Sequence, residues 1–115
     1  MRKVRDLGYL WDMLDAAQSV VAFVRGKTLQ DYVRDPLLQA PVERKIEILG
    51  EAARKVSEEY KELHQEIPWR GIIGQRNVLI HEYNEVDQRA IWELATADIP
   101  KLIKLLEPLV PPAPD

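Results

Sequence analysis

The sequence contains no cysteine among its 115 residues. This absence excludes a disulfide framework, a thiol nucleophile and any metal site built on cysteine, and it is typical of proteins from a reducing compartment. Long apolar runs are also missing, since none approaches the ~20 residues that a membrane-spanning helix needs. The segment from Met1 to Asp6 leads into an amphipathic stretch and does not resemble a signal peptide. We therefore expect a soluble, cytoplasmic protein without a membrane partner.

A surplus of positive charge is lacking as well, because 16 Lys and Arg stand against 19 Asp and Glu. A slightly acidic chain does not attract nucleic acid through a broad positive field. Any contact with nucleic acid must therefore be local, and no DNA partner is expected.

Strand-like alternation is absent, and the apolar residues instead follow helical spacing. Steps of three and four residues predict a first helix over 4–24. Its buried stripe would be Val4, Leu7, Trp11, Leu14, Ala17, Val21 and Val24. Gly26 then ends this helix. Thr28 and Asp31 indicate a capping box for a short second helix that ends near Arg34.

Two prolines set the expected limits of the third helix and the start of the fourth. Asp35-Pro36 is a turn or helix-start signal, but Pro41 would remove a hydrogen bond deep inside a helix, so we expect the main third helix to begin at or just before Pro41. Apolar residues at helical spacing extend that helix to Leu63. A loop over 63–68 follows, and Pro68 suits the first position of a fourth helix that ends near Tyr83.

The last helix is expected to begin after Asp87, a favourable N-cap residue, and to continue to Leu109 with a kink at Pro100. Every predicted linker is short, and no internal repeat is present. The sequence therefore predicts an all-α fold, a five-helix antiparallel bundle. It forms a single domain over residues 1–110, followed by a Pro-rich tail over 111–115.

The stretch from Arg76 to Tyr83 concentrates the reactive side chains of the chain. At ~100° per residue, Arg76 and Tyr83 lie on the apolar face of the fourth helix, where a charge needs a partner or a wet cleft. His81 lies about 140° from Arg76 and shares its flank with Asn77. A buried ion pair for Arg76, a solvated helix-end His81 and a core Tyr83 are the plain structural alternatives.

The chain resembles the HepT-like proteins of the HEPN superfamily, minimal ribonucleases of prokaryotic toxin–antitoxin pairs. The resemblance extends almost from end to end, and only Pro41 and the Pro-rich tail depart from it. It is carried by an ordered set of segments: Arg5-Asp6 through Asp12-Met13-Leu14, Ile48-Leu49-Gly50-Glu51-Ala52, Ile67-Pro68-Trp69 and Arg76-Asn77-Val78-Leu79-Ile80-His81-Glu82-Tyr83.

This resemblance implies a homodimer in which two Arg-x-x-x-x-His motifs face a shared cleft, with RNA as the substrate and cleavage that needs neither a metal nor another cofactor. Arg76 and His81 would be the catalytic pair, and Asn77 would be the supporting polar residue. Tyr83 matches the tyrosine that a partner nucleotidyltransferase of the MNT type, the antitoxin, modifies with AMP in type VII-like systems. One His81 per chain leaves a second proton-transfer role open, which a symmetric dimer would fill.

Two other functions stay open at this stage. The chain could be a non-catalytic helical module that pairs with a nucleotidyltransferase, as its acidic charge favours, or a structural dimer whose motif is coincidental. Among the minor candidates, His64 is expected to be solvated and Glu51 to be a surface or dimer-face charge. The cations Arg44, Lys45, Arg54, Lys55 and Arg70 are expected to form a wet face that adds positive potential only if it lies near the cleft.

Overall fold

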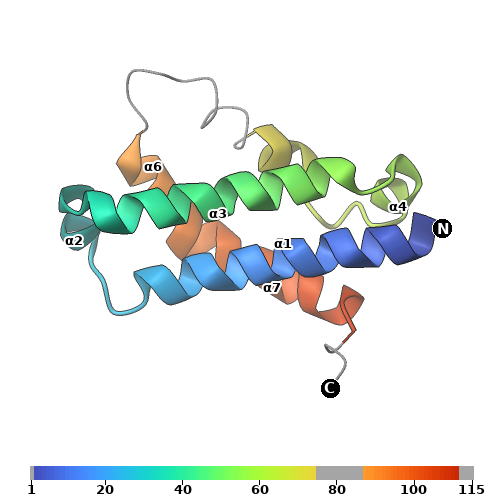
Figure 1. The fold of residues 1–115 in the computed structure, drawn as a ribbon, viewed down its shortest axis with the longest axis horizontal. Coiled ribbons are helices and arrows are strands. Elements are labelled where there is room, and N and C mark those ends of the chain that lie inside the picture. Colours follow the sequence, from blue (N-terminus) through green and yellow to red (C-terminus); the bar gives the residue numbers. More distant parts are fainter. Residues whose placement is uncertain (1, 75–86, 112–115) are drawn as a thin grey trace.

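The computed structural model of the chain describes residues 2–74 and 87–111, and within these ranges every regular element is a helix (Figure 1). The predicted all-α class is confirmed. Six α-helices are bounded in the described residues, against the five expected for the whole chain. They are α1 (Arg2–Val24), α2 (Leu29–Arg34), α3 (Pro36–Lys55), α4 (Glu58–Leu63), α6 (Gln88–Glu93) and α7 (Ile99–Leu106), with a π-helix over Leu94–Asp98 and a 3-10 turn over Glu107–Leu109. Residues 69–74 are also helical.

The two long helices form the frame. α1 and α3 lie side by side and run in opposite directions, with α2 at one end of the pair and α4 at the other (Figure 1). α7 packs against α1, and α6 packs against α2. The largest fully buried side chains come from α1, α2, α3, α7 and the turn before residue 69, and they include Leu10, Tyr32, Ile46, Ile67 and Leu106.

The predicted extent of α1 is close to the observed one, and Ala17 and Val24 of the predicted stripe are buried, but the prediction was wrong in the first half of the helix. Val4, Leu7 and Trp11 are 64%, 39% and 45% exposed, and Leu14 and Val21 are only half-buried. The side that packs into the protein carries Asp6, Leu10, Met13, Ala17, Val20 and Val24. Both stripes have helical spacing and share Ala17 and Val24, but in the first half of α1 the buried residues lie one position, about 100°, away from those that apolarity favoured.

The third helix begins earlier than expected, at Pro36, so the prediction of a start near Pro41 was wrong. Asp35 caps the helix by accepting a hydrogen bond from the Leu37 N–H at 3.0 Å, and Pro36 occupies the first turn, where its missing N–H costs nothing. Pro41 lies inside the helix and leaves the Leu37 carbonyl without its usual partner. Leu37 is 87% exposed, so water can satisfy that carbonyl.

The same helix ends earlier than expected, at Lys55, so the predicted continuation to Leu63 was also wrong. Ser57 caps α4 by accepting from the Tyr60 N–H at 3.2 Å. In turn, the buried carboxylate of Asp6 accepts from the Ser57 backbone N–H at 2.9 Å and from its hydroxyl at 2.7 Å. These bonds hold residue 57 in an extended conformation and break the helix between α3 and α4.

The last helix departs from a regular α-helix at the predicted position. The π-helix over Leu94–Asp98 ends just before Pro100, and the N–H of Ile99 bonds to the Leu94 carbonyl five residues earlier. A proline lacks the N–H that a regular helix needs at this point, so a local change of hydrogen-bond pattern is the expected response. Beyond Leu106 the chain tightens into the 3-10 turn and does not extend as an α-helix to Leu109.

Candidate functional site

The segment that carries the motif is anchored at both of its ends, whereas Arg76, Asn77, His81 and Tyr83 themselves lie outside the described residues. Their roles therefore stay predictions. On the side that leads into the motif, residues 69–74 are helical, so a helix follows Pro68 as expected, starting one residue later. The site is built from these flanks and from the surfaces beside them.

Trp69 fixes the approach to the motif. Its side chain is only 8% exposed, and its indole N–H donates to the His64 carbonyl at 3.0 Å. Tyr60 meets its ring edge-on at 6.5 Å between centroids, and the Lys61 ammonium lies 6.0 Å from the ring centroid. A buried tryptophan with its one donor satisfied gives a firm attachment. The direction in which the chain enters the motif is therefore set by the core.

The far flank is fixed by the start of α6, as the sequence predicted. The Asp87 carboxylate accepts from the N–H groups of Arg89 and Ala90 at 3.1 and 3.2 Å, which makes it the N-cap. The next residue, Gln88, donates its amide to the Glu43 carboxylate of α3 at 3.3 Å. Both ends of the motif segment thus attach to the frame.

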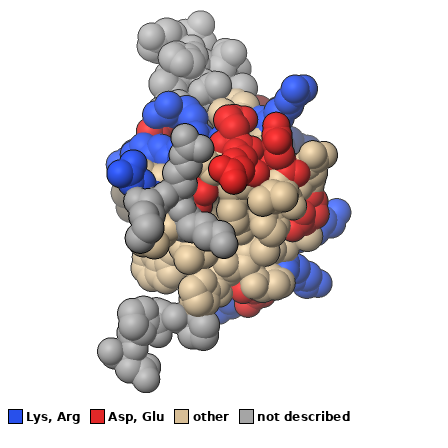
Figure 2. Space-filling view, turned by 90° about the vertical axis from the view of Figure 1, so that its right-hand side faces the viewer, with Lys and Arg blue, Asp and Glu red and all other residues tan. Residues whose placement is uncertain are grey.

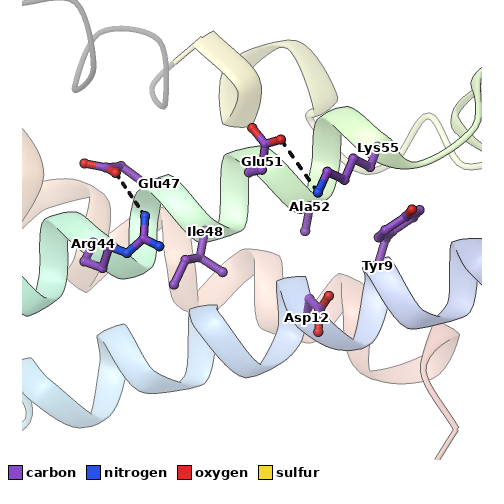
Figure 3. A pocket seen from close by; sticks show the side chains of 8 residues that line it. All are labelled: Tyr9, Asp12, Arg44, Glu47, Ile48, Glu51, Ala52 and Lys55. Carbon is purple, nitrogen blue, oxygen red and sulfur yellow. Dashed lines mark hydrogen bonds and ion pairs between the residues drawn. The ribbon is translucent and has the colours of Figure 1, made fainter.

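A hollow of about 360 Å³ lies between α1 and α3, and its walls carry charges of both signs (Figure 3). Tyr9 and Asp12 line it from α1. Across from them on α3, Arg44 pairs with Glu47 at 3.3 Å, and Lys55 lies 3.8 Å from Glu51.

The cations of α3 do not form a separate positive patch. Arg54 also pairs with Glu51, at 2.7 Å, so three of the five basic residues weighed above have acidic partners on the same helix. Such exposed pairs contribute little stability, but they lower the positive potential that a phosphate backbone would meet. The expectation that Glu51 is a surface charge agrees with its partly exposed position.

On the face shown in Figure 2, a group of acidic side chains lies between Lys and Arg side chains. Glu58, Glu59 and Glu62 of α4 are exposed. A phosphate backbone is repelled by such a group, so the surface of α4 is a poor place for nucleic acid to bind.

A second cavity, of about 380 Å³, lies directly beside the helical residues 69–74. Its walls come from α3, from that helical segment, from the π-helix and from α7. Most of its lining is aliphatic, including Ile46, Leu49, Ile72, Leu94, Leu102 and Leu105. The charged residues Glu66, Asp98 and Lys101 also belong to the lining. A few polar groups around an apolar hollow are typical of sites for small organic groups.

His64 is not the solvated side chain that the sequence predicted. Its ring stacks on Tyr60 with 4.2 Å between centroids, and its Nδ1 lies 3.2 Å from a Glu66 carboxylate oxygen. Hydrogen bonding at the Glu66 backbone N–H, and then the contact with His64, lower the pKa of the Glu66 carboxyl. His64 thus belongs to the structure that holds Trp69.

Sequence reasoning also missed the buried Asp6 and the aliphatic cavity, because both are made by segments far apart in the chain. Among residues 2–74 and 87–111, no group of three or more His, Cys, Asp or Glu residues is arranged to hold a metal ion. Within the same ranges, no helix is long and apolar enough to cross a membrane.

Comparison with known proteins supports the resemblance. The model of the family described as "Ribonuclease HepT-like" matches residues 13–109, which include the whole motif. "Probable ribonuclease HepT" of Thermococcus cleftensis is 39% identical over 94 residues, which span 82% of this chain and 86% of its own. "Putative RNase TTE0752" of Caldanaerobacter subterraneus subsp. tengcongensis is 37% identical over 102 residues, 89% of this chain and 91% of its own.

No solved structure matches the chain significantly. The family match covers well over half of the sequence, and both relatives are more than 30% identical over most of their length. The chain therefore belongs to the HepT-like ribonuclease family, and ribonuclease is the enzyme class that this membership assigns to it.

Proposed function

We propose that the chain is a metal-independent endoribonuclease toxin of a type VII-like toxin–antitoxin pair, and that it works as a homodimer. The observation that carries the proposal is the family match over residues 13–109, since it includes Arg76 and His81 at the spacing of the family motif. The anchored flanks at Trp69 and Asp87 support it further, because a catalytic segment must be held by a rigid frame.

In the proposed reaction, the 2′-OH of the RNA attacks the adjacent phosphorus. His81 takes the 2′-OH proton as general base, the new O2′–P bond forms, and the P–O5′ bond breaks. The departing 5′-oxygen receives a proton from a general acid, leaving a 2′,3′-cyclic phosphate and a 5′-OH. Histidine suits these roles because its ordinary pKa of ~6.5 lies near neutral pH. Arg76 stabilises the charge on the phosphorane oxygens through its paired donors.

The exposed stripe on α1 supports the homodimer. Val4, Leu7 and Trp11 lie one or two turns apart on one side of the helix and leave an indole and two aliphatic side chains in contact with water. Covering such a stripe is favourable by roughly 25 cal/mol per Å² of apolar surface. In an antiparallel pairing of two α1 helices centred on this stripe, Val4 of one copy comes opposite Trp11 of the other, so the stripe is complementary to itself. This self-complementarity favours a second copy of this chain as the partner.

A dimer would also supply the second proton-transfer group. Each chain contains two histidines, and His64 is already engaged with Tyr60 and Glu66. The His81 of the partner chain is then the available general acid at a site between two protomers. Asn77, four residues before His81, orients the imidazole or the phosphate.

Control of this activity is proposed to act through Tyr83. A partner nucleotidyltransferase transfers AMP from ATP to the Tyr83 hydroxyl and releases pyrophosphate. The bound phosphate then occupies the position near Arg76 that an RNA phosphate needs, so substrate is excluded.

Expression of the chain alone in cells tests the toxin. Induction of the wild type should stop growth, and the His81→Ala variant, at equal expression, should not. Undiminished toxicity of that variant would contradict the proposal.

The rival function is a non-catalytic module that binds a nucleotidyltransferase, which the net charge of −3 favours. That module would bind the partner without cleaving RNA. A purified protein that takes up AMP from the partner but leaves every RNA intact would establish the rival.

A further inference from the structure

We infer that the aliphatic cavity beside residues 69–74 binds one base of the RNA strand near the bond that is cut, and that it favours guanine. This inference rests on the proposed function and names how the same site selects its substrate. The cavity is made entirely of described residues and is distinct from the hollow between α1 and α3.

The size and lining of the cavity fit a splayed-out base. Its volume of about 380 Å³ lies near the lower end of the ~300–1,000 Å³ that is usual for small-molecule sites. Leu49, Ile72 and Leu102 are among the aliphatic side chains that line it. Proteins read single-stranded RNA through bases that swing out of the stack and insert between apolar or aromatic side chains. A flat base can thus replace water against these walls.

The polar groups of the lining give the cavity a preference. The Asp98 carboxylate can accept hydrogen bonds at both oxygens, one oxygen of Glu66 already contacts His64, and Lys101 can donate. The adjacent N1–H and N2 amino group of guanine match the two oxygens of one carboxylate. Uracil presents a single donor in this region, so it forms the weaker pair. Lys101 supplies positive charge for the phosphate that follows the bound base.

Chain geometry keeps the cavity close to the predicted catalytic arginine. Gly71 and Ile72 line the cavity, and Ile72 precedes Arg76 by four residues. Consecutive Cα atoms are 3.8 Å apart, so the Cα of Arg76 lies within about 15 Å of the Cα of Ile72 in any conformation. A few nucleotides of a single strand span this distance. A base in the cavity and a phosphate at Arg76 can therefore belong to one bound RNA.

The π-helix forms part of the cavity wall. Its first and last residues, Leu94 and Asp98, both line the cavity. Pro100 accounts for its altered hydrogen bonding, so the π-helix shapes the cavity and is not separate evidence for a ligand.

Filling the cavity is the direct test. Gly71 lines it, and a Cβ built at Gly71 meets no other atom within 4 Å, so Gly71→Leu adds a side chain there without a backbone clash. Gly74 has the same open surroundings in the same helical segment but does not line the cavity, which makes Gly74→Leu the matched control. The substrates are RNA oligonucleotides that differ in one base at each position around the cut, together with the same RNA made abasic at that position.

The wild type should prefer guanine at one position and should lose about ten-fold in kcat/KM when that nucleotide is abasic. Gly71→Leu should show the same loss on the guanine substrate and no further loss on the abasic one, whereas Gly74→Leu should behave as the wild type. Equal losses on both substrates, or equal losses in both variants, would overturn the inference.

A second variant tests the preference itself. Asp98→Asn keeps the size of the side chain but replaces one carboxylate oxygen with an amide donor, so discrimination between guanine and uracil should fall while cleavage of the abasic RNA stays unchanged. Unaltered discrimination both in this variant and in Glu66→Gln would overturn the assignment of guanine. If the wild type cleaves no RNA at all, the proposed function fails. Cleavage without any base preference overturns the cavity inference alone.

Discussion

The carboxylate of Asp6 accepts two hydrogen bonds from Ser57, a residue 51 positions away in the sequence, at 2.9 Å from the backbone N–H and at 2.7 Å from the hydroxyl. Asp6 is the buried charged side chain of the described core, with 5% of its surface exposed. One carboxylate thus joins the beginning of α1 to the junction between α3 and α4. The junction is followed by α4 and a turn, and these lead into the segment that carries the motif.

Replacing Asp6 should destabilise the protein measurably. Asp6→Ala removes two hydrogen bonds to a carboxylate and leaves the Ser57 N–H without its partner, so the free energy of unfolding should fall by about 2–4 kcal/mol. Asp6→Asn keeps one acceptor and should cost about half as much. Urea denaturation measures both values, with the exposed Asp15→Asn of the same helix as the control. An Asp6→Ala variant as stable as the wild type would show that these bonds are not used in solution.

The capping box at α2 should give the protein a stability component that depends on pH. The Asp31 carboxylate accepts from the Thr28 backbone N–H at 2.9 Å. This bond, followed by the contact with the Thr28 hydroxyl, lowers the pKa of Asp31 below the ordinary value of 3.8. Because the pKa of Asp31 is lower in the folded state, the ionised carboxylate stabilises the protein fully well above pH 3.8. This stabilisation is lost as the pH falls through the folded-state pKa of Asp31.

Thermal denaturation should therefore show a lower Tm for Asp31→Asn than for the wild type at pH 7. The difference should shrink as the pH falls below 3.8 and through the lowered folded-state pKa of Asp31, because its side chain then becomes neutral like that of Asn. The same difference at both pH values would mean that the carboxylate charge has no part in the cap.

The exposed stripe of α1 should control the oligomeric state. Trp11→Ser removes the largest apolar side chain of the stripe, so the dimer should dissociate at concentrations where the wild type stays paired. Leu37→Ser is the matched control, since Leu37 is 87% exposed on α3 and outside the stripe. Light scattering measures the mass, and circular dichroism checks that both variants stay helical. A Trp11→Ser dimer as tight as the wild type would place the interface elsewhere.

Modification by the antitoxin should be confined to one tyrosine. After co-expression with its partner nucleotidyltransferase, the intact protein should gain the mass of AMP, and Tyr83→Phe should gain none. Among the other three tyrosines, Tyr32 has no exposed surface, and Tyr9 and Tyr60 are only partly exposed, with Tyr60 packed against His64 and Trp69. Tyr9→Phe should therefore gain AMP as the wild type does. An AMP group on Tyr83→Phe would contradict the assignment.

Local signals in the sequence predicted much of the fold. The capping box of Thr28 and Asp31, the N-cap at Asp87 and the disturbance before Pro100 are all observed, because each depends on residues within one or two turns. The predicted helix start near Pro41 was wrong for two reasons. Asp35 caps the helix at its true start. Leu37, whose carbonyl loses its partner to Pro41, is exposed to water, so the helix tolerates this proline.

Long-range contacts could not be predicted in the same way. The stripe of α1 that is buried contains Asp6, so hydropathy alone favoured the more apolar stripe with Trp11, which is exposed. Only the position of Ser57 makes a buried carboxylate favourable. The aliphatic cavity likewise needs four separate segments to be brought together. The motif was found from sequence alone, and the geometry of Arg76 and His81 stays a prediction.

Cleavage of RNA by the purified protein in excess EDTA tests the central claim most directly. The account predicts that the wild type converts RNA to fragments ending in a 2′,3′-cyclic phosphate, and that His81→Ala and Arg76→Ala each lower the rate by at least 100-fold. The control is His64→Gln, which changes the other histidine but keeps the backbone carbonyl that accepts from Trp69, so it should retain activity. A wild-type protein without activity, or a His81→Ala variant as active as the wild type, would contradict the account.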